Sequence, residues 1–342
     1  MKRDMDLWLR ELLATEKKPA LPILSFPAVQ LMGVSVRELI SDSKLQAKGM
    51  QMVAGRVPAA ASVSLMDLSV EADCFGASVR FSDDEVPTVT GALGSDEDAA
   101  KALPVPKVGA GRSGICVEAL RLAAEQINHR PVFAGVIGPF SLAGRLMGVT
   151  EAMIYCYEEP EMVHILLEKA CGFLMEYCAA FQAAGANGVV MAEPLAGLLS
   201  PELAAEFSAP YVKKIVEKVQ NRNFAVVYHN CGGSTGQPVD SILSTGAAAY
   251  HFGNAISMAE MMTHIPSDVI VMGNVDPAAE FRNGTPESVR AATLGVMRGC
   301  CKYPNFIISS GCDIPPLSPW ENIDAFFAAV DEFYASAGEE KV

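Results

Sequence analysis

Short apolar runs alternate with longer helical stretches along most of the chain. Each run is rich in Val, Ile, Phe or small residues, which is typical of strands buried on both faces. The pattern predicts eight strands, at Leu21–Phe26, Ser62–Leu68, Val132–Ile137, Gly188–Ala192, Phe224–His229, Ala247–Phe252, Val269–Gly273 and Phe306–Ser309. Eight strands with helical crossovers in 342 residues predict one domain, residues 1–342, folded as an α/β (β/α)8 TIM barrel.

Hydroxyl residues followed by proline mark the starts of three predicted helices. They stand at Ser200-Pro201, Thr285-Pro286 and Ser318-Pro319. A hydroxyl side chain caps the first amides of a helix, and proline suits the first turn. Ser318 with Glu321 also has the spacing of a capping box.

The connection between the second and third predicted strands is too long for a plain crossover. Within it, residues 77–81 and 86–89 are short extended runs that flank the turn-like residues 82–85. This arrangement predicts a β-hairpin insertion after strand 2, on the rim of the barrel. A doubly wound open sheet is the competing architecture, but no glycine-rich dinucleotide loop follows the first strand.

Composition and charge limit the class of protein. Apolar residues make up 50% of the chain and charged residues 19%, which suffices for a large core and excludes a disordered protein. The net charge of −14 argues against nucleic acid or an anionic membrane as the main partner. The sequence has no apolar run of spanning length and no signal-peptide pattern at its start, so we expect a cytoplasmic protein.

Polar and metal-binding residue types gather at the predicted strand ends. In a barrel the carboxyl ends of the strands form the active-site face, so this placement points to a site. The residues are Asp67, Glu193, His229, Cys231, His251, Asn274, Asp276 and Cys312.

His229, Cys231 and Cys312 form the sharpest group. Residues two apart in an extended segment point the same way, so His229 and Cys231 can face one point. Cys312, at the end of the eighth strand, can approach that point from across the rim. Two sulfurs and one nitrogen suit Zn²⁺ and leave a fourth position for water or substrate. The alternative is a buried histidine with two core thiols.

The remaining strand-end residues allow two interpretations each. Asp67 and Glu193 are candidate catalytic carboxylates, as general acid or orienting group, or else a helix cap or ion-pair partner. Asn274, Asp276 and His251 are candidate cofactor-binding residues. Alternatively, Asp276 caps the next helix and His251 belongs to the barrel wall.

Several of these motifs together resemble the uroporphyrinogen decarboxylase superfamily. They are Met66-Asp67-Leu68, Gly138-Pro139-Phe140-Ser141, Gly185-Ala186 leading to Glu193-Pro194, and Gly273-Asn274-Val275-Asp276-Pro277. The resemblance covers almost the whole chain and implies the same barrel fold.

Within that superfamily, the chain is most similar to the methylcobamide:coenzyme M methyltransferase branch. The similar motifs are Val227-Tyr228-His229-Asn230-Cys231-Gly232 and Gly311-Cys312-Asp313-Ile314-Pro315-Pro316. The resemblance implies that His229, Cys231 and Cys312 bind zinc. It also implies a methylated corrinoid on a carrier protein as methyl donor, and coenzyme M or a related small molecule as acceptor. The branch often carries Val-Glu-Glu where this chain has Tyr250-His251-Phe252-Gly253.

The decarboxylase branch is the alternative. Asp67 matches the position of its catalytic aspartate, but its arginine-rich segment after the first strand is replaced here by Ser25–Gly33, which has no arginine. A substrate with many carboxylates would lack counter-charges. A third hypothesis is a non-catalytic protein that binds a tetrapyrrole or corrinoid.

Overall fold

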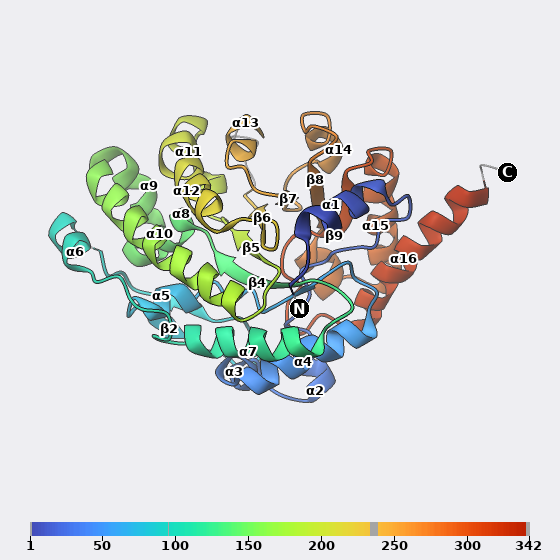
Figure 1. The fold of residues 1–342 in the computed structure, drawn as a ribbon, viewed down its shortest axis with the longest axis horizontal. Helices are drawn as coiled ribbons and strands as arrows, with labels where there is room; N and C mark the ends of the chain where they lie inside the picture. The colour runs from blue at the N-terminus through green and yellow to red at the C-terminus, as the bar shows by residue number, and fades with distance from the viewer. Residues whose placement is uncertain (1, 95, 233–238, 340–342) are drawn as a thin grey trace.

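The computed structural model describes residues 2–94, 96–232 and 239–339. Seven parallel strands form one curled sheet in the order β1-β4-β5-β6-β7-β8-β9, around which the helices pack (Figure 1). The strands are β1 (Ser62–Val63), β4 (Val132–Ile137), β5 (Gly188–Ala192), β6 (Ala225–Asn230), β7 (Ala249–Phe252), β8 (Ile270–Val275) and β9 (Phe306–Ser310). This is an α/β fold consistent with a TIM-like barrel.

Helices fill the connections between the strands. In the first part of the chain they are α1 (Met5–Ala14), α2 (Ala28–Met32), α3 (Val36–Ser41), α4 (Ser43–Arg56), α5 (Val70–Cys74), α6 (Glu97–Ala102), α7 (Ser113–Gln126), α8 (Pro139–Met147), α9 (Val149–Glu158) and α10 (Pro160–Ala183). The later ones are η1 (Ala196–Leu198), α11 (Pro201–Phe207), α12 (Ala209–Val219), α13 (Val239–Leu243), α14 (Met258–Met261), η2 (Pro277–Arg282), α15 (Pro286–Cys300) and α16 (Trp320–Glu339). Within the described ranges, none of them has the length and apolarity that crossing a bilayer requires.

The first predicted strand, Leu21–Phe26, is not a strand in the structure. The segment still runs between the two edge strands, because Leu21 N donates to Ile308 O at 3.0 Å and Ala60 N donates to Ala20 O at 2.8 Å. Regular pairing fails beyond that point. Pro22 has no amide hydrogen, and Ile23 N donates to the Ser310 side chain instead of a strand carbonyl.

The second predicted strand is much shorter than its apolar run. Only Ser62–Val63 pairs with β4. After it, Gly135 N donates to the Ser64 hydroxyl at 3.0 Å, so a side chain replaces the backbone acceptor. The chain then turns at Asp67, whose carbonyl accepts from Val70 N. The other predicted strands agree with the structure to within two residues at each end.

A separate two-stranded antiparallel sheet lies in the connection between β1 and β4. It pairs β2 (Ser78–Arg80) with β3 (Thr88–Thr90), with Val79 opposite Val89. The loop between these strands contributes Asp84, Glu85, Val86 and Pro87 to the lining of a pocket described below, and Thr88 of β3 lines it as well.

The inner face of the sheet is apolar near the amino ends of the strands. Phe133, Val190, Val227 and Ile270 belong to one buried cluster, together with Met5 and Leu12 of α1. Trp8 of the same helix packs on Phe133 with ring centroids 5.8 Å apart. Helix α1 therefore contributes to the apolar packing there, and the polar residues lie at the carboxyl ends.

Two of the three predicted helix starts are confirmed. Ser200 accepts a hydrogen bond from Leu203 N at the start of α11, and Thr285 forms a capping box with Ser288 at the start of α15. The box predicted for Ser318 and Glu321 is wrong. Helix α16 begins at Trp320, and the buried Ser318 hydroxyl has no hydrogen-bond partner.

Candidate metal centre and pocket

His229, Cys231 and Cys312 meet at the carboxyl end of the sheet. His229 lies near the end of β6, Cys231 follows that strand, and Cys312 follows β9. Their ligand atoms all lie within 4.8 Å of one another, with His229 Nε2 and Cys312 Sγ 3.4 Å apart. His229 is fully buried, whereas both cysteines are partly accessible. The structure thus brings together the three residues that the sequence analysis predicts as metal ligands.

Local packing explains how Cys231 fits there. A Cβ atom added to Gly253, which follows β7, would lie 2.7 Å from Cys231 Cα. Such a contact is too short for any residue with a side chain, so glycine at this position allows the backbone after β6 to approach the end of β7.

The two sulfurs share a hydrogen bond that sets their protonation. This bond lowers the pKa of Cys231, and it raises that of Cys312 to about 12. The hydrogen bond therefore favours the ionised form of Cys231 relative to an ordinary thiol, while Cys312 keeps its proton. A metal ion that binds both sulfurs would displace that proton into solvent, because thiolates are the metal-binding form.

The donor set fits zinc. Zinc binds thiolate at about 2.3 Å and imidazole nitrogen at about 2.0–2.1 Å in tetrahedral sites, so its ligands lie about 3.6 Å apart. The 3.4 Å between His229 Nε2 and Cys312 Sγ is close to that separation. Three protein ligands leave a fourth position for a small molecule, as in catalytic zinc sites.

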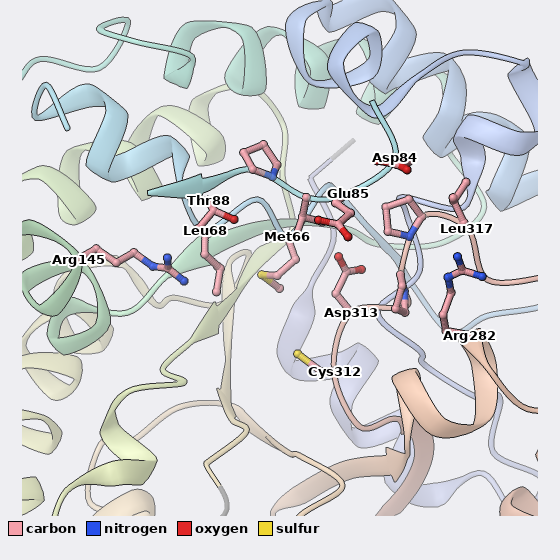
Figure 2. A pocket seen from close by; sticks show the side chains of 14 residues that line it. Met66, Leu68, Asp84, Glu85, Thr88, Arg145, Arg282, Cys312, Asp313 and Leu317 are labelled. Carbon is pink, nitrogen blue, oxygen red and sulfur yellow. The ribbon is translucent and has the colours of Figure 1, made fainter. Parts of the chain in front are cut away.

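A pocket of about 510 Å³ opens beside Cys312 (Figure 2). Arg145 extends toward it from α8, and Asp313, Arg282 and Met66 also line it. Arg145 Nε and Asp313 Oδ1 are buried atoms without a hydrogen-bond partner. A buried polar atom without a partner is costly, so both atoms are available for a bound molecule.

Glu193 lies near the site but away from the pocket lining. Its carboxylate accepts hydrogen bonds from Phe140 N at 2.8 Å, Ser141 N at 3.1 Å and the Ser141 hydroxyl at 2.9 Å. Complete burial raises its pKa to about 7. A Cβ at Gly138 would lie 2.2 Å from the Glu193 side chain. Glu193 therefore caps the start of α8, one of the two interpretations that the sequence allows.

Asp67 is an ion-pair partner. Its carboxylate contacts the Arg112 guanidinium and accepts from the Ser69 hydroxyl at 2.6 Å. Arg112 also contacts Asp73 at 3.2 Å. The acid thus lies buried in a network of its own, next to the pocket residues Met66 and Leu68.

The three candidate cofactor-binding residues make structural contacts. Asn274 donates to the carbonyls of Gly253 and Ile256 after β7. Asp276 accepts from Ala278 N and Ala279 N and so caps η2. His251 pairs in register with His229 on the neighbouring strand. A role of these three residues toward a cofactor stays a prediction.

A family model described as uroporphyrinogen decarboxylase (URO-D) matches residues 15–333. The chain belongs to the uroporphyrinogen decarboxylase family. This confirms the resemblance that the strand-end motifs indicate.

Curated relatives within the uroporphyrinogen decarboxylase family are enzymes of two kinds. The methylcobamide:CoM methyltransferase MtbA of Methanosarcina acetivorans is 27% identical over 262 residues, which cover 75% of each chain. A uroporphyrinogen decarboxylase of Coxiella burnetii is 26% identical over 291 residues, covering 81% of this chain and 78% of the relative.

A solved structure shows the same fold. A methyltransferase from Methanosarcina mazei matches with a TM-score of 0.83 and 23% identity, covering 95% of this chain and 98% of the other. The methyltransferase and the decarboxylase relatives are nearly equally identical to this chain. The choice between the two activities therefore depends on the residues of the site.

Sequence reasoning missed several residues of the site. Arg145 lies on α8, the helix that begins with the Gly138-Pro139-Phe140 motif at a strand end. That location is the one sequence feature that could have indicated it as a site residue. Asp313 belongs to the motif that contains the predicted ligand Cys312, but the sequence assigns it no role. Arg112 and Ser309 become significant only through contacts with residues distant in sequence.

Proposed function

We propose that this protein is a zinc-dependent methyltransferase that moves a methyl group from a methylated corrinoid to a small-molecule thiol. The convergence of His229, Cys231 and Cys312 within 4.8 Å, beside a pocket, is the observation that supports it most. We also take the segment at residues 20–24 as the eighth position of a (β/α)8 barrel, because it hydrogen-bonds to β9 on one side and to Ala60, just before β1, on the other.

In this proposal His229 Nε2 and the sulfurs of Cys231 and Cys312 hold the metal. When bound there, zinc would lower the pKa of a coordinated acceptor thiol so that it reacts as thiolate. The partly accessible Cys312 forms the boundary between metal centre and pocket. An acceptor in the pocket therefore reaches the fourth position without rearrangement of the barrel.

The pocket suits a thiol with an acidic group, such as coenzyme M or a related acceptor. Arg145 presents a guanidinium whose Nε has no partner, on the side of the pocket opposite Arg282 and the acids Asp84, Glu85 and Asp313 (Figure 2). A guanidinium binds carboxylate or sulfonate with charge-assisted hydrogen bonds. Binding of that group would orient the acceptor sulfur toward the metal centre.

The transfer itself is a nucleophilic substitution at the methyl carbon. The acceptor sulfur forms the new bond to carbon, the cobalt–carbon bond breaks, and its electron pair stays on cobalt, which passes from Co(III) to Co(I). The thiol proton is released to solvent. We place the corrinoid on a carrier protein that docks at the carboxyl end of the barrel, where the pocket opens.

A decarboxylase is the second candidate, since relatives of that activity match equally well. Asp67 would be its catalytic residue, but Arg112 already pairs with this carboxylate. The segment at residues 25–33 supplies no arginine to the pocket. These contacts favour the methyltransferase.

Metal analysis followed by an assay tests the proposal. We expect about one zinc per chain in protein purified without chelators, and methylation of coenzyme M with methylcobalamin as donor. Cys312→Ala is expected to lose both. Protein that contains no zinc and takes up none on reconstitution would contradict the methyltransferase proposal, and decarboxylation through Asp67 would then be assayed.

A further inference from the structure

A line of buried hydrogen bonds leads away from His229. Its Nδ1 lies 2.8 Å from His251 Nδ1, and His251 Nε2 lies 2.8 Å from the Ser309 hydroxyl. That hydroxyl donates to the Leu21 carbonyl at 2.7 Å. All three side chains are almost completely buried, so water does not compete for these bonds.

The direction of each hydrogen bond follows from the last bond of the line, between Ser309 and the Leu21 carbonyl. Because the Ser309 proton is used on the Leu21 carbonyl, its oxygen accepts from His251, and His251 therefore carries its proton on Nε2. A neutral imidazole that carries its proton on Nε2 keeps Nδ1 bare. The bare Nδ1 of His251 is then an acceptor, and His229 must donate from Nδ1.

A second contact agrees with this assignment. His229 Nδ1 also lies 3.3 Å from the His251 backbone carbonyl, which can only accept. With the proton on Nδ1, the Nε2 of His229 keeps its lone pair, and that nitrogen is the one facing Cys312 at 3.4 Å. An imidazole must offer a bare nitrogen to bind a metal.

We propose that His251 is a positioning residue that fixes the tautomer and ring orientation of His229, with Ser309 and the Leu21 carbonyl fixing His251 in turn. The proposal rests on the zinc site proposed above. Both ring nitrogens of His251 take part in these hydrogen bonds.

The arrangement differs from the usual support of a metal-binding histidine. That support is a carboxylate, a backbone carbonyl or water, each of which only needs to accept. A neutral histidine accepts only in one of its two tautomers. Ser309 thereby gains an influence on the metal centre although two hydrogen bonds separate it from His229 Nε2.

Zinc affinity, measured by chelator competition, tests this proposal. We expect His251→Leu to weaken zinc binding roughly 10- to 100-fold, the usual effect of losing such a partner. His251→Gln offers an acceptor and a donor in one side chain and is expected to restore much of that loss. Ser309→Ala is expected to cause a smaller loss, because the His251 ring keeps its contact with His229 in that variant.

Ser310→Ala is the matched control. Ser310 is the next residue of β9, equally buried, and its hydroxyl accepts from Ile23 N at 3.0 Å. Loss of that hydroxyl disturbs the same strand and the same N-terminal segment but leaves the His251 bonds in place. We expect unchanged zinc affinity in Ser310→Ala. Circular dichroism of each variant without metal tests whether that variant is folded.

Two further measurements distinguish positioning from packing. The visible spectrum of the cobalt(II)-substituted protein is expected to change in His251→Leu and to recover in His251→Gln. In metal-free protein, ¹⁵N spectra are expected to show His229 protonated on Nδ1. Protonation on Nε2 instead would overturn the proposal, whether or not the protein binds zinc.

The outcomes separate this proposal from the proposed function. Zinc in the wild-type protein with wild-type affinity in both His251→Leu and Ser309→Ala would overturn the positioning role alone. A wild-type protein that binds no zinc would overturn the methyltransferase and this inference together.

Discussion

His229 Nε2 and Cys312 Sγ lie 3.4 Å apart although their strands, β6 and β9, are separated by β7 and β8 in the sheet. A flat sheet would hold those strand ends about 14 Å apart, at about 4.8 Å between neighbouring strands. Curling of the sheet brings the two side chains together. The candidate metal centre is therefore a product of the barrel shape and not of a local motif.

Replacement of Cys312 separates a metal ligand from an ordinary thiol. We expect Cys312→Ser to reduce zinc from about one per chain to near zero, because only two strong ligands remain. Cys301→Ser removes another partly accessible sulfur, at the end of α15 and outside the candidate metal centre, and is expected to keep full zinc. Equal zinc in the two variants, by elemental analysis, would contradict the ligand assignment.

Arg145 is predicted to select acceptors by charge. A charge-assisted hydrogen bond contributes about 1.5–3 kcal/mol, so Arg145→Met is expected to raise KM for coenzyme M roughly 10- to 100-fold. The neutral thiol 2-mercaptoethanol is the internal control and should show little change. A parallel loss with both thiols would instead indicate that Arg145 supports the pocket structurally.

Glu71 gives a prediction for stability against pH. Burial raises its pKa from 4.5 to about 7, and its Oε2 has no hydrogen-bond partner. Between pH 4.5 and about pH 7, Glu71 is largely ionised in the unfolded chain but keeps its proton in the folded protein. The free energy of unfolding therefore falls as pH rises through this range. Full ionisation costs about 3 kcal/mol.

We therefore expect Glu71→Gln to exceed the wild type in free energy of unfolding by about 3 kcal/mol at pH 8 and by less than about 1 kcal/mol at pH 5. The backbone bond from Ile137 N to Oε1 remains possible with glutamine. Urea unfolding at both pH values measures the difference. The exposed Glu176→Gln serves as control, and an equal pH dependence in both variants would refute the explanation.

The ion pair between Asp67 and Arg112 predicts non-additive stability. Arg112→Gln leaves a buried carboxylate without its cation and is expected to cost about 3–5 kcal/mol, whereas adding Asp67→Asn should recover most of that loss. Denaturant unfolding of the single and double variants gives the coupling energy. Asp67→Asn should also keep methyl-transfer activity. Loss of that activity in a folded Asp67→Asn variant would support a catalytic role of Asp67.

The sequence predicts the buried strands well where apolar runs are continuous. Val132–Ile137 and Gly188–Ala192 have the same bounds in the prediction and in the structure. It fails at Leu21–Phe26, because an apolar run shows burial but not whether its amides find backbone partners. There Pro22 and the Ser310 hydroxyl interrupt the pairing.

The three ligand candidates are predictable because each lies at a strand end, where barrel geometry sets its direction. The role of His251 is not, since it depends on Ser309, which is distant in sequence and has no motif. Likewise, Glu193 appears catalytic from its position, yet its three accepted hydrogen bonds make it a helix cap. The position of a residue at a strand end indicates where its side chain lies, but not which groups form hydrogen bonds with it.

Ser309 lies in the last strand, β9, and Cys312 follows that strand, whereas Leu21 and His229 precede it in the chain. Synthesis proceeds from the amino end, so a ribosome-bound chain has made His251 and Cys231 before either of these partners exists. A chain that stops short of β9 lacks the third ligand and the hydroxyl that orients His251. Zinc retention would thus mark chains that have been translated beyond their final strand, as far as Cys312.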